Sequence, residues 1–431
     1  MIELFHFGVA VDRAEAERAL APLSLERLEQ LGLLTAAPEG TRALVALFPF
    51  DGLVIVSDRP TQRGREPRDH VMDVSSPSLL LASVSMRRRV GSALDLCTGS
   101  GVQAFLAARN ADRVVAVDVN PRALNFAAFG ARLNGIENVE LREGDLYEPV
   151  AGERFGLIVA NPPYVVSPET SLLLRDGGLP GDSFCELLVR RAPAFLEEGG
   201  YAHVVVNWAH GADEHWSAPI REWVADTGCD ALLLHQVSQE PLDYAALWNR
   251  DLREDRGAYA AALDRWTEYH RRHGIEAIAS GVIVLRRREG ANWIRAEELL
   301  PDMLLPADHH IARLFEGQDF LAAHDEAAFL DGRFLLAEEH VLEETVRLGE
   351  GGGTQRRVLR LQNGLRWQVA LDANTASVLS RLDGRRPLRQ VLTDAAEAAD
   401  ESAPPPDRFV EAGLRAVRRL VELGFVVPAE D

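Results

Sequence analysis

Short apolar runs alternate with amphipathic stretches through the middle of the chain. The runs predict seven strands, at Ala93–Leu96, Val114–Asp118, Val139–Leu141, Leu157–Ala160, Ala202–Val206, Ala231–His235 and Ile278–Leu285. Helices are predicted between the early strands, and one of them begins at Pro121 with Asn120 as its cap. This alternation is typical of a doubly wound α/β domain with a largely parallel sheet. We therefore expect a Rossmann-like α/β domain over residues 61–290.

The stretch 241–273 has a helical pattern and separates the last two predicted strands, which form a simple hairpin in a minimal domain of this kind. We interpret the stretch as a helical insertion. Its ring-bearing side chains are Tyr244, Trp248, Tyr259, Trp266, Tyr269 and His270. Two explanations stay open for them: a cap over a substrate pocket, or core packing, which is the commoner place for such side chains.

Residues 1–60 predict two short helices followed by two β-rich runs. The helices are Arg13–Leu20 and Leu23–Leu31, and Gly32 stands just past the end of the second. Turn-forming residues join the runs Thr41–Phe48 and Leu53–Ser57. This order predicts a winged-helix-like N-terminal domain. Such domains bind nucleic acid or protein, or cover a neighbouring domain, and the sequence does not choose among these roles.

Residues 291–431 predict a C-terminal accessory domain. The turn Asn363-Gly364 indicates a hairpin within Arg357–Leu371. Helices are expected after it, at Asn374–Leu382, Leu388–Ala399 and Asp407–Leu423. A chain of 431 residues is long enough for these three regions.

The charge balance bears on the kind of partner. The chain has 66 acidic and 46 basic residues, which gives a formal charge of −20. Indiscriminate binding to a duplex depends on neutralising many phosphates, so this balance disfavours nucleic acid without excluding it.

Three features indicate a cytoplasmic protein. The cysteines, Cys97, Cys185 and Cys229, are odd in number and far apart, which indicates a reducing compartment without a disulfide framework. No apolar run approaches the roughly 18 residues of a membrane span. The first residues, Met1–His6, lack the basic and apolar regions of a signal peptide.

A glycine turn follows the first predicted strand, in Asp95-Leu96-Cys97-Thr98-Gly99-Ser100-Gly101. Gly99 and Gly101 permit a tight turn and let backbone amides approach a ligand closely. Asp118 ends the next strand about 20 residues on, where a carboxylate accepts hydrogen bonds from ribose hydroxyls. Asp145 follows the third strand, where it either reads an adenine amino group or forms a strand-end turn. A nicotinamide-dependent dehydrogenase has the same turn and acid, so these residues alone indicate only a nucleotide-type cofactor.

Asn161-Pro162-Pro163-Tyr164 directly follows the fourth strand, and ligand sites in open α/β sheets form outside the carboxyl ends of strands. A following proline biases Asn161 away from the α region, and the second proline stiffens the turn. We expect the Asn161 amide oxygen and the Pro162 carbonyl to point into one cavity, where two adjacent acceptors suit the two hydrogens of an NH2 group. Tyr164 offers a flat face on which a planar amide or base stacks.

This arrangement predicts methylation of a planar NH2 nitrogen. A sulfonium methyl group is already activated, so positioning supplies most of the acceleration without acid or metal. Hydrogen bonds to Asn161 and Pro162 would orient the nitrogen lone pair, which an amide or base shares with a π system. They also stabilise charge that develops on the nitrogen, an effect worth about 3 kcal/mol for one well-aimed group. We expect no metal site, because the histidine groups at Asp308–His310 and His210–His215 lack a placed third ligand.

Residues 91–166 resemble the glutamine N5-methyltransferases that modify peptide-chain release factors and a ribosomal protein. Asp95–Gly101 matches their cofactor loop, Ala116–Leu124 their ribose-binding strand and helix start, and Asn161–Tyr164 their catalytic signature. The resemblance implies a seven-stranded class I methyltransferase domain that uses S-adenosylmethionine and releases S-adenosylhomocysteine. The implied cofactor-binding residues are Asp95, Cys97, Thr98, Gly99, Gly101, Asp118, Val119, Asp145, Leu146 and Asn161. The implied catalytic residues are Asn161, Pro162 and Tyr164, and the implied acceptor-binding residues are Asn161, Pro163 and Tyr164.

The Asn-Pro-Pro-Tyr element is shared with N6-adenine DNA methylases and several rRNA and tRNA methylases, so it specifies the chemistry better than the acceptor. We expect a glutamine-type amide of a protein or peptide as the acceptor. A base in RNA or DNA and a small-molecule amine stay open, whereas the intact signature disfavours a non-enzymatic binding module. The run Leu371–Leu392 is similar to winged-helix domains that hold precursor peptides; its alternative role is packing against the methyltransferase core. The sequence does not indicate an oligomeric state.

Overall fold

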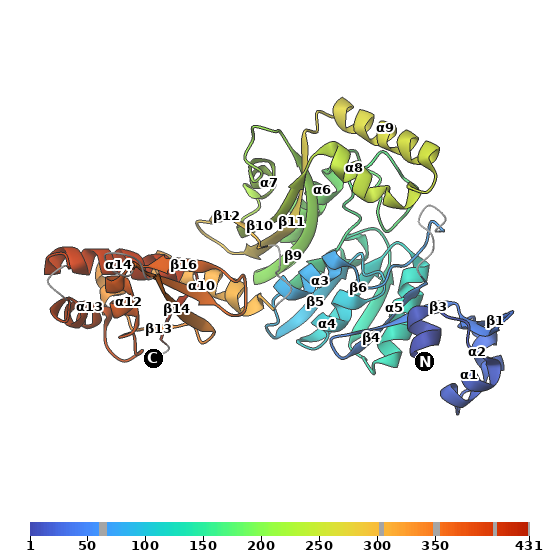
Figure 1. Cartoon of the computed structure of the whole chain (residues 1–431), viewed down its shortest axis with the longest axis horizontal. Helices are drawn as coiled ribbons and strands as arrows, with labels where there is room; N and C mark the ends of the chain where they lie inside the picture. The colour runs from blue at the N-terminus through green and yellow to red at the C-terminus, as the bar shows by residue number, and fades with distance from the viewer. Residues whose placement is uncertain (60–66, 301–305, 348–353, 400–402, 430–431) are drawn as a thin grey trace. The chain divides into compact units, whose positions relative to one another are not determined.

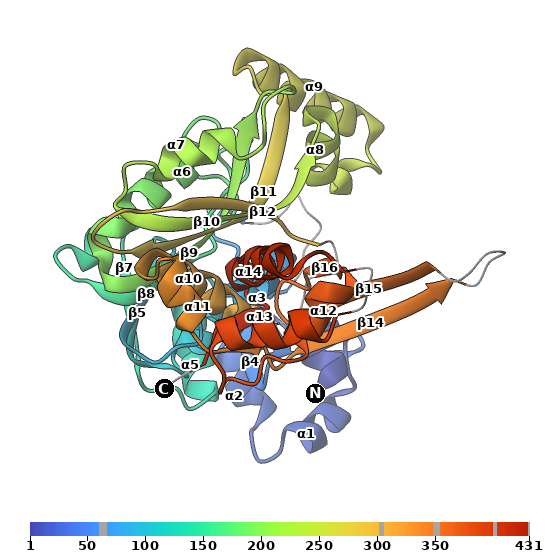
Figure 2. The same ribbon diagram turned by 90° about the vertical axis from the view of Figure 1, so that its left-hand side faces the viewer.

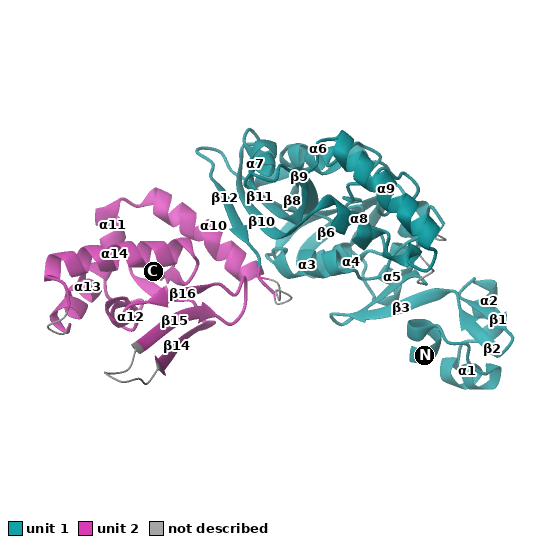
Figure 3. Ribbon diagram, turned by 45° about the horizontal axis from the view of Figure 1, so that its top comes forward, with its two compact units in different colours: residues 1–299 teal, residues 300–431 magenta. Residues whose placement is uncertain are grey.

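The computed structural model describes residues 1–59, 67–300, 306–347, 354–399 and 403–429. The chain divides into two compact units, residues 1–299 and residues 300–431 (Figure 3). The borders expected after residues 60 and 290 do not coincide with this division, and the arrangement in three regions stays a prediction. Among the described helices, none has the length and apolar character needed to cross a bilayer.

A mixed sheet forms the centre of the first unit and has eight strands in the described part of the chain (Figure 1). In spatial order these are β12 (Ile294–Glu298), β10 (Cys229–Gln239), β11 (Ala277–Arg287), β9 (Leu196–His210), β8 (Phe155–Ala160), β5 (Val90–Leu96), β6 (Ala111–Asp118) and β7 (Val139–Glu143). β11 runs antiparallel to both of its neighbours, and every other neighbouring pair is parallel. The expected doubly wound α/β domain is confirmed.

The eighth strand, β12, corrects the expectation of seven strands. It was assigned to the C-terminal region, but it extends the sheet beyond β10, with Ala231 paired to Ile294. Its sequence, Ile-Arg-Ala-Glu-Glu, contains no continuous apolar run, because an edge strand has only one neighbour and its side chains are only partly buried. Hydrophobic patterning therefore did not reveal it.

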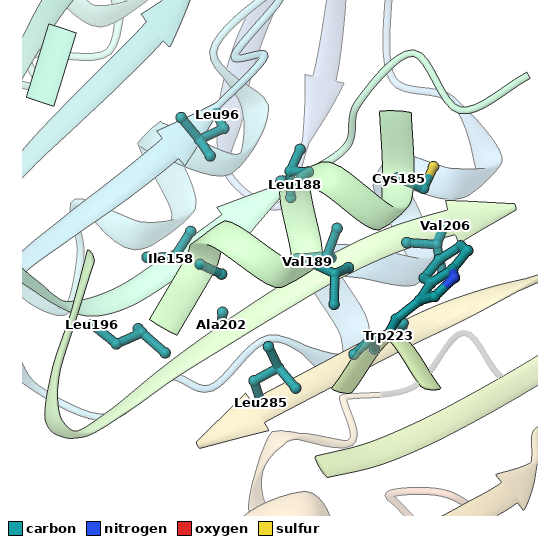
Figure 4. Packing of buried hydrophobic residues seen from close by; sticks show 14 of the residues in the cluster. Leu96, Ile158, Cys185, Leu188, Val189, Leu196, Ala202, Val206, Trp223 and Leu285 are labelled. Carbon is teal, nitrogen blue, oxygen red and sulfur yellow. The ribbon is translucent and has the colours of Figure 1, made fainter. Parts of the chain in front are cut away.

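Five helices connect the parallel strands or precede them: α3 (Ser76–Val84), α4 (Val102–Ala107), α5 (Pro121–Leu133), α6 (Ser183–Arg191) and α7 (Ala218–Val224). A large core lies between α6, α7 and the sheet (Figure 4). There Leu188 and Val189 of α6 and Trp223 of α7 are buried with Ile158 and Ala202 of the strands. This core holds the ends of β5 and β8 at fixed positions.

The first 59 residues pack onto the central domain. They form a π-helix (Ile2–Phe7), α1 (Arg13–Leu20), α2 (Leu25–Gln30) and two hairpins, β1 (Leu34–Ala37) with β2 (Gly40–Ala43) and β3 (Val45–Phe50) with β4 (Leu53–Asp58). The single strand expected at Thr41–Phe48 is in fact split between β2 and β3. Phe126 of α5 belongs to the core of this segment. The side-chain amide of Asn134 accepts a hydrogen bond from the Val54 amide at 2.8 Å and donates one to the Val54 carbonyl at 2.9 Å. The winged-helix assignment stays a prediction.

The stretch 241–273 forms α8 (Pro241–Trp248), a 3-10 turn (Arg250–Leu252) and α9 (Arg256–Arg272), between β10 and β11. The two helices lie side by side next to the ends of these strands (Figures 1 and 2). They begin two residues after β10 and end five residues before β11. The insertion is therefore attached to the sheet by short connections.

The second unit has a core of its own. Its elements are α10 (Asp308–Ala323), α11 (Glu326–Asp331), β13 (Phe334–Leu336), β14 (His340–Arg347), β15 (Thr354–Leu361), β16 (Gln368–Leu371), α12 (Ala373–Leu379), α13 (Leu388–Glu397), α14 (Pro406–Glu422) and β17 (Val426–Pro428). The hairpin expected at Asn363-Gly364 is present as β15 and β16, which pair antiparallel. Phe329, Val391 and Val417 are among its fully buried residues. Its likeness to peptide-binding winged-helix domains stays a prediction.

Candidate active site

Two turns lie next to each other at the carboxyl ends of neighbouring strands. β5 pairs in parallel with β6 on one side and β8 on the other, so the strand order reverses between β5 and β8. Leu96 at the end of β5 is in register with Ala160 at the end of β8. The glycine turn that begins at Cys97 and the proline turn that begins at Asn161 therefore start side by side. Open α/β sheets bind ligands at such a reversal.

The glycine turn has a left-handed backbone at three residues, with φ of 56° at Cys97, 55° at Gly99 and 88° at Gly101. Glycine adopts this region without steric cost. At Gly101 a side chain is also excluded by space, since a Cβ would lie 2.6 Å from the ring of Phe105. A Cβ on Gly99 would meet no atom of the described chain within 4 Å. The turn is thus packed against its helix at Gly101 and open at Gly99.

Asp95 holds this turn from inside the domain. Its buried Oδ2 accepts hydrogen bonds from the Thr98 hydroxyl at 2.6 Å and from the Ala104 amide at 2.9 Å. Burial raises the pKa of Asp95 to about 7; the two hydrogen bonds oppose this rise, and the charge of Asp118 adds to it. The side chain thus joins the end of β5 to α4. A direct contact between Asp95 and a cofactor stays a prediction.

Asp118 joins the end of β6 to the same turn. Its Oδ2 accepts a hydrogen bond from the Gly99 amide at 2.8 Å, and its Oδ1 accepts one from the Asn120 amide at 2.9 Å. Burial raises the pKa of Asp118, and hydrogen bonds from backbone amides partly offset the rise. Each carboxylate oxygen has two lone pairs, so the side chain retains capacity for a ribose hydroxyl. Asn120 caps α5 as expected, by accepting a hydrogen bond from the Arg122 amide at 3.0 Å.

Three other predicted cofactor residues follow the ends of β6 and β7. Val119 is 45% exposed, an uncovered apolar side chain directly after Asp118. Asp145 is exposed after β7. Leu146 is buried and has a left-handed φ of 45°, which turns the chain inward after Asp145. Contacts of Val119, Asp145 and Leu146 with a cofactor stay a prediction.

The glycine turn lies in a negative field. Burial raises the pKa of the Cys97 thiol well above its ordinary value, and the charges of Asp118, Asp95 and Asp145 raise it further. These three carboxylates therefore all act on the same point of the turn. A negative potential of this kind favours a positively charged ligand and disfavours an anionic one.

Asn161 presents an amide whose two ends are used differently. Its Nδ2 donates a hydrogen bond to the Ser78 hydroxyl at 3.2 Å. Its Oδ1 is shielded from solvent and has no hydrogen-bond partner within the described residues. A buried polar atom without a partner is costly and is uncommon in folded proteins. The structure thus orients the amide through its nitrogen and leaves its oxygen without a donor among the described residues.

Ser78 is a site residue that the sequence analysis missed. It lies in α3, its carbonyl accepts a hydrogen bond from the Gln103 side chain at 2.9 Å, and its hydroxyl is 3.0 Å from that of Ser75. These contacts tie Asn161 to α3 and to α4. The sequence contained a signal for this helix, because Ser75 is its N-cap and a proline stands in its first turn.

The rest of the signature continues into apolar surroundings. Pro162 is buried, whereas Pro163 and Tyr164 are partly buried. The ring of Tyr164 packs against two clusters, the main sheet core and a smaller cluster that includes Val165 and Val166. Burial raises the pKa of the Tyr164 hydroxyl, so the side chain is neutral over the physiological range. Its stacking against an acceptor stays a prediction.

The histidine groups considered for metal binding make other contacts. His310 accepts a hydrogen bond from the Leu365 amide at 3.1 Å and pairs with the Leu423 carbonyl at 2.8 Å. His210 lies 3.1 Å from the Ser238 hydroxyl. Within the described ranges, no group of three or more His, Cys, Asp or Glu side chains has the arrangement of a metal site.

Comparison with known proteins follows the same division of the chain. Residues 69–225 match the family model of the methyltransferase small domain, and residues 312–428 match a domain of unknown function (DUF7782). The release factor glutamine methyltransferase of Xylella fastidiosa is 35% identical over 158 residues, which cover 34% of this chain and 56% of that protein. The ribosomal protein uL3 glutamine methyltransferase of Xanthomonas campestris is 40% identical over 201 residues, which cover 44% of this chain and 61% of that protein. The chain thus spans a little over half the length of these curated relatives.

The residues of the glycine turn fit S-adenosylmethionine, the cofactor of this class. The turn is open at Gly99, Asp118 has acceptor capacity for a ribose, and the carboxylates beside the turn favour the positive charge of a sulfonium. The neighbouring turn begins at Asn161, whose side-chain oxygen has no partner among the described residues. The sheet order, both turns and the family match together identify residues 69–225 as a class I methyltransferase domain.

Proposed function

We propose that this protein transfers a methyl group from S-adenosylmethionine to the nitrogen of a planar NH2 group, and that the acceptor is a glutamine-type amide of a protein or peptide. The observation that carries the proposal is the buried, unpartnered Oδ1 of Asn161, held in place by the hydrogen bond from its Nδ2 to Ser78. An N–H of the acceptor satisfies that oxygen. In this account Asn161, Pro162, Pro163 and Tyr164 form the acceptor side of the site.

The chain's own residues have three tasks in this chemistry. When bound, S-adenosylmethionine supplies a methyl group that is already activated by the positive charge on its sulfur. Asn161 Oδ1 and the Pro162 carbonyl each accept one N–H of the acceptor and so direct the nitrogen lone pair out of the amide plane. The same two acceptors stabilise the positive charge that develops on this nitrogen, as preorganised groups do. The methylated nitrogen then releases one proton to water. The prolines keep the turn rigid, so that little reorganisation is needed.

A protein acceptor is supported by the relatives and by charge. The names of the two relatives above describe methylation of glutamine in a release factor and in ribosomal protein uL3. The formal charge of −20 disfavours a long contact with nucleic acid phosphates. We place this activity in the cytoplasm, which is consistent with the free state of Cys97, Cys185 and Cys229.

The proposal is tested by following labelled methyl groups from the cofactor into acceptors. The purified enzyme is incubated with a lysate of its own host, and portions are treated with protease or nuclease before separation. We expect the label in protease-sensitive material and, by mass spectrometry, a methyl group on a glutamine side chain. Label in nuclease-sensitive material, or in small molecules that pass a filter, would instead identify a base or an amine as the acceptor. Absence of transfer to every fraction would reject the methyltransferase activity.

A further inference from the structure

The helical insertion packs on the segment that follows the proline turn. Val165 and Val166 share a buried cluster with Tyr244 of α8, Trp266 of α9 and Ile278 of β11. Trp266 and Val166 are fully shielded from solvent. Tyr244 and Trp266 therefore belong to a core. They do not form an open cap whose rings face a substrate.

Both backbone groups of Val166 are bonded to the insertion. Its amide donates a hydrogen bond to the Tyr244 hydroxyl at 3.1 Å, and its carbonyl is 2.9 Å from Nε2 of His270. Because a carbonyl only accepts, His270 carries a proton on Nε2. The Tyr244 hydroxyl also accepts a hydrogen bond from the Asn207 amide of β9 at 2.8 Å. Tyr244 thus connects Val166, which lies two residues after Tyr164, to the sheet.

Helix α9 also holds the rest of the loop. Arg265 pairs with Glu169 at 2.9 Å, and the hydroxyl of Tyr269 accepts a hydrogen bond from the Gly181 amide at 2.7 Å. Residues four apart on a helix lie on one face, so Arg265 and Tyr269 form one row on α9, next to the row formed by Trp266 and His270. The loop between residues 165 and 181 is therefore held near both of its ends by one helix.

We propose that Tyr244 and His270 are positioning residues for methyl transfer: they fix Val166 and thereby the ring of Tyr164 on the acceptor side. The inference rests on the proposed function, in which Tyr164 contacts the acceptor. Tyr164 packs between the sheet core and the cluster formed with the insertion, so the insertion supplies one of the two surfaces that place its ring. The hydrogen-bond partners found for Asp95, Asp118 and the glycine turn do not include the insertion. Loss of the contacts that the insertion makes should therefore weaken methylation of the acceptor and leave cofactor binding unchanged.

The first test needs no acceptor. Tyr244→Phe removes the hydroxyl that Val166 and Asn207 use, and Tyr259→Phe makes the same change in the other helix of the insertion, α9, where the ring lies beside Arg253. Hydrogen–deuterium exchange is measured on peptides that cover residues 161–182. For Tyr244→Phe we expect exchange in this segment to be about tenfold faster than in the wild type, because a buried amide loses its acceptor. Equal exchange in the Tyr244→Phe and Tyr259→Phe variants would overturn the proposal.

The second test compares two replacements of His270. Glutamine keeps an N–H donor near the position of Nε2, whereas leucine does not. We expect kcat/KM for the acceptor to fall about tenfold in His270→Leu and less in His270→Gln, while the Kd for S-adenosylhomocysteine stays within about twofold. An equal fall in both variants, or a matching loss of cofactor affinity, would contradict a positioning role. If the wild type methylates no acceptor, the proposed function fails, and the exchange experiment still decides whether the insertion fixes the loop.

Discussion

The two turns of the site satisfy their polar groups in opposite ways. In the glycine turn, the carboxylates of Asp95 and Asp118 accept four hydrogen bonds from the turn and its helices, all between 2.6 and 2.9 Å. In the proline turn, Asn161 Oδ1 has no partner among the described residues. The first turn is therefore complete as a structure before a ligand arrives, whereas the second contains a buried acceptor whose partner must come from outside the chain.

This difference assigns separate tasks to the two turns. A turn whose acidic groups are already held in place by hydrogen bonds changes little when a cofactor enters. A turn with an unpaired buried acceptor gains most when a donor binds, because that donor removes the cost of the unpaired group. The acceptor side should therefore control turnover, and the cofactor side should control cofactor affinity.

The largest effect is expected at the unpaired oxygen. Asn161→Ala removes the acceptor that stabilises charge on the methylated nitrogen, so we expect kcat to fall about 100-fold or more. Cofactor affinity, measured by titration with S-adenosylhomocysteine, should stay within about twofold of the wild type, since the glycine turn is unchanged. A variant that keeps normal turnover would break the contrast between the turns.

A smaller effect, on cofactor binding, is expected at the glycine turn. Asp118→Ala leaves the Gly99 amide without its acceptor and removes the carboxylate assigned to the ribose, so the Kd for S-adenosylhomocysteine should rise about tenfold to 100-fold. The control is Asp112→Ala at the start of the same strand, where the side chain is 62% exposed and pairs with Arg89. The contrast fails if the two variants bind the cofactor equally well.

The contrast is sharpened by Ser78, which orients Asn161 without reaching the acceptor. Ser78→Ala removes the acceptor of Asn161 Nδ2, and a loss of about fivefold in kcat is expected for one neutral hydrogen bond. Ser83→Ala is the matched control, because Ser83 is also buried in α3 but bonds only the Leu80 carbonyl at 2.8 Å in the described contacts. Equal kcat in the two variants would show that Ser78 does not orient the amide.

A separate effect concerns stability. The pKa of Asp95 is about 7 in the folded protein, against 3.8 for an unperturbed aspartate. The unfolded chain therefore loses this proton at a lower pH, and the contribution of Asp95 to stability falls as the pH rises from 3.8 toward 7. Relative to Asp95→Asn, which lacks this titration, the wild-type free energy of unfolding should decrease over that range and then level. Chemical denaturation at several pH values measures the free energy of unfolding of both proteins. Parallel pH profiles for the wild type and Asp95→Asn would contradict the raised pKa of Asp95.

Both turns could be predicted from the sequence because their signals are local. Glycine at positions that need a left-handed backbone, and an asparagine followed by two prolines, identify the ends of β5 and β8 without any knowledge of packing. The reversal of strand order then places these ends together. Helix α3 and its Ser78 were missed because the helix is buried nearly all round, so its apolar residues show no helical period.

The contacts of the insertion could not be predicted in the same way. Tyr244 and His270 lie 78 and 104 residues from Val166 along the chain. The periodicity of α9 shows which face is apolar, but the identity of the segment that covers this face depends on the tertiary fold. The choice between cap and core therefore stayed open until the structure showed both side chains buried against the loop.

The most direct test of the central claim is a crystal structure of the protein with S-adenosylhomocysteine and a peptide that contains the acceptor glutamine before methylation. The account predicts that the side-chain nitrogen of this glutamine lies 2.7–3.2 Å from Asn161 Oδ1, the usual distance of such a hydrogen bond, while Nδ2 keeps its contact with Ser78. A complex in which the acceptor nitrogen binds elsewhere and Asn161 Oδ1 still has no partner would contradict it.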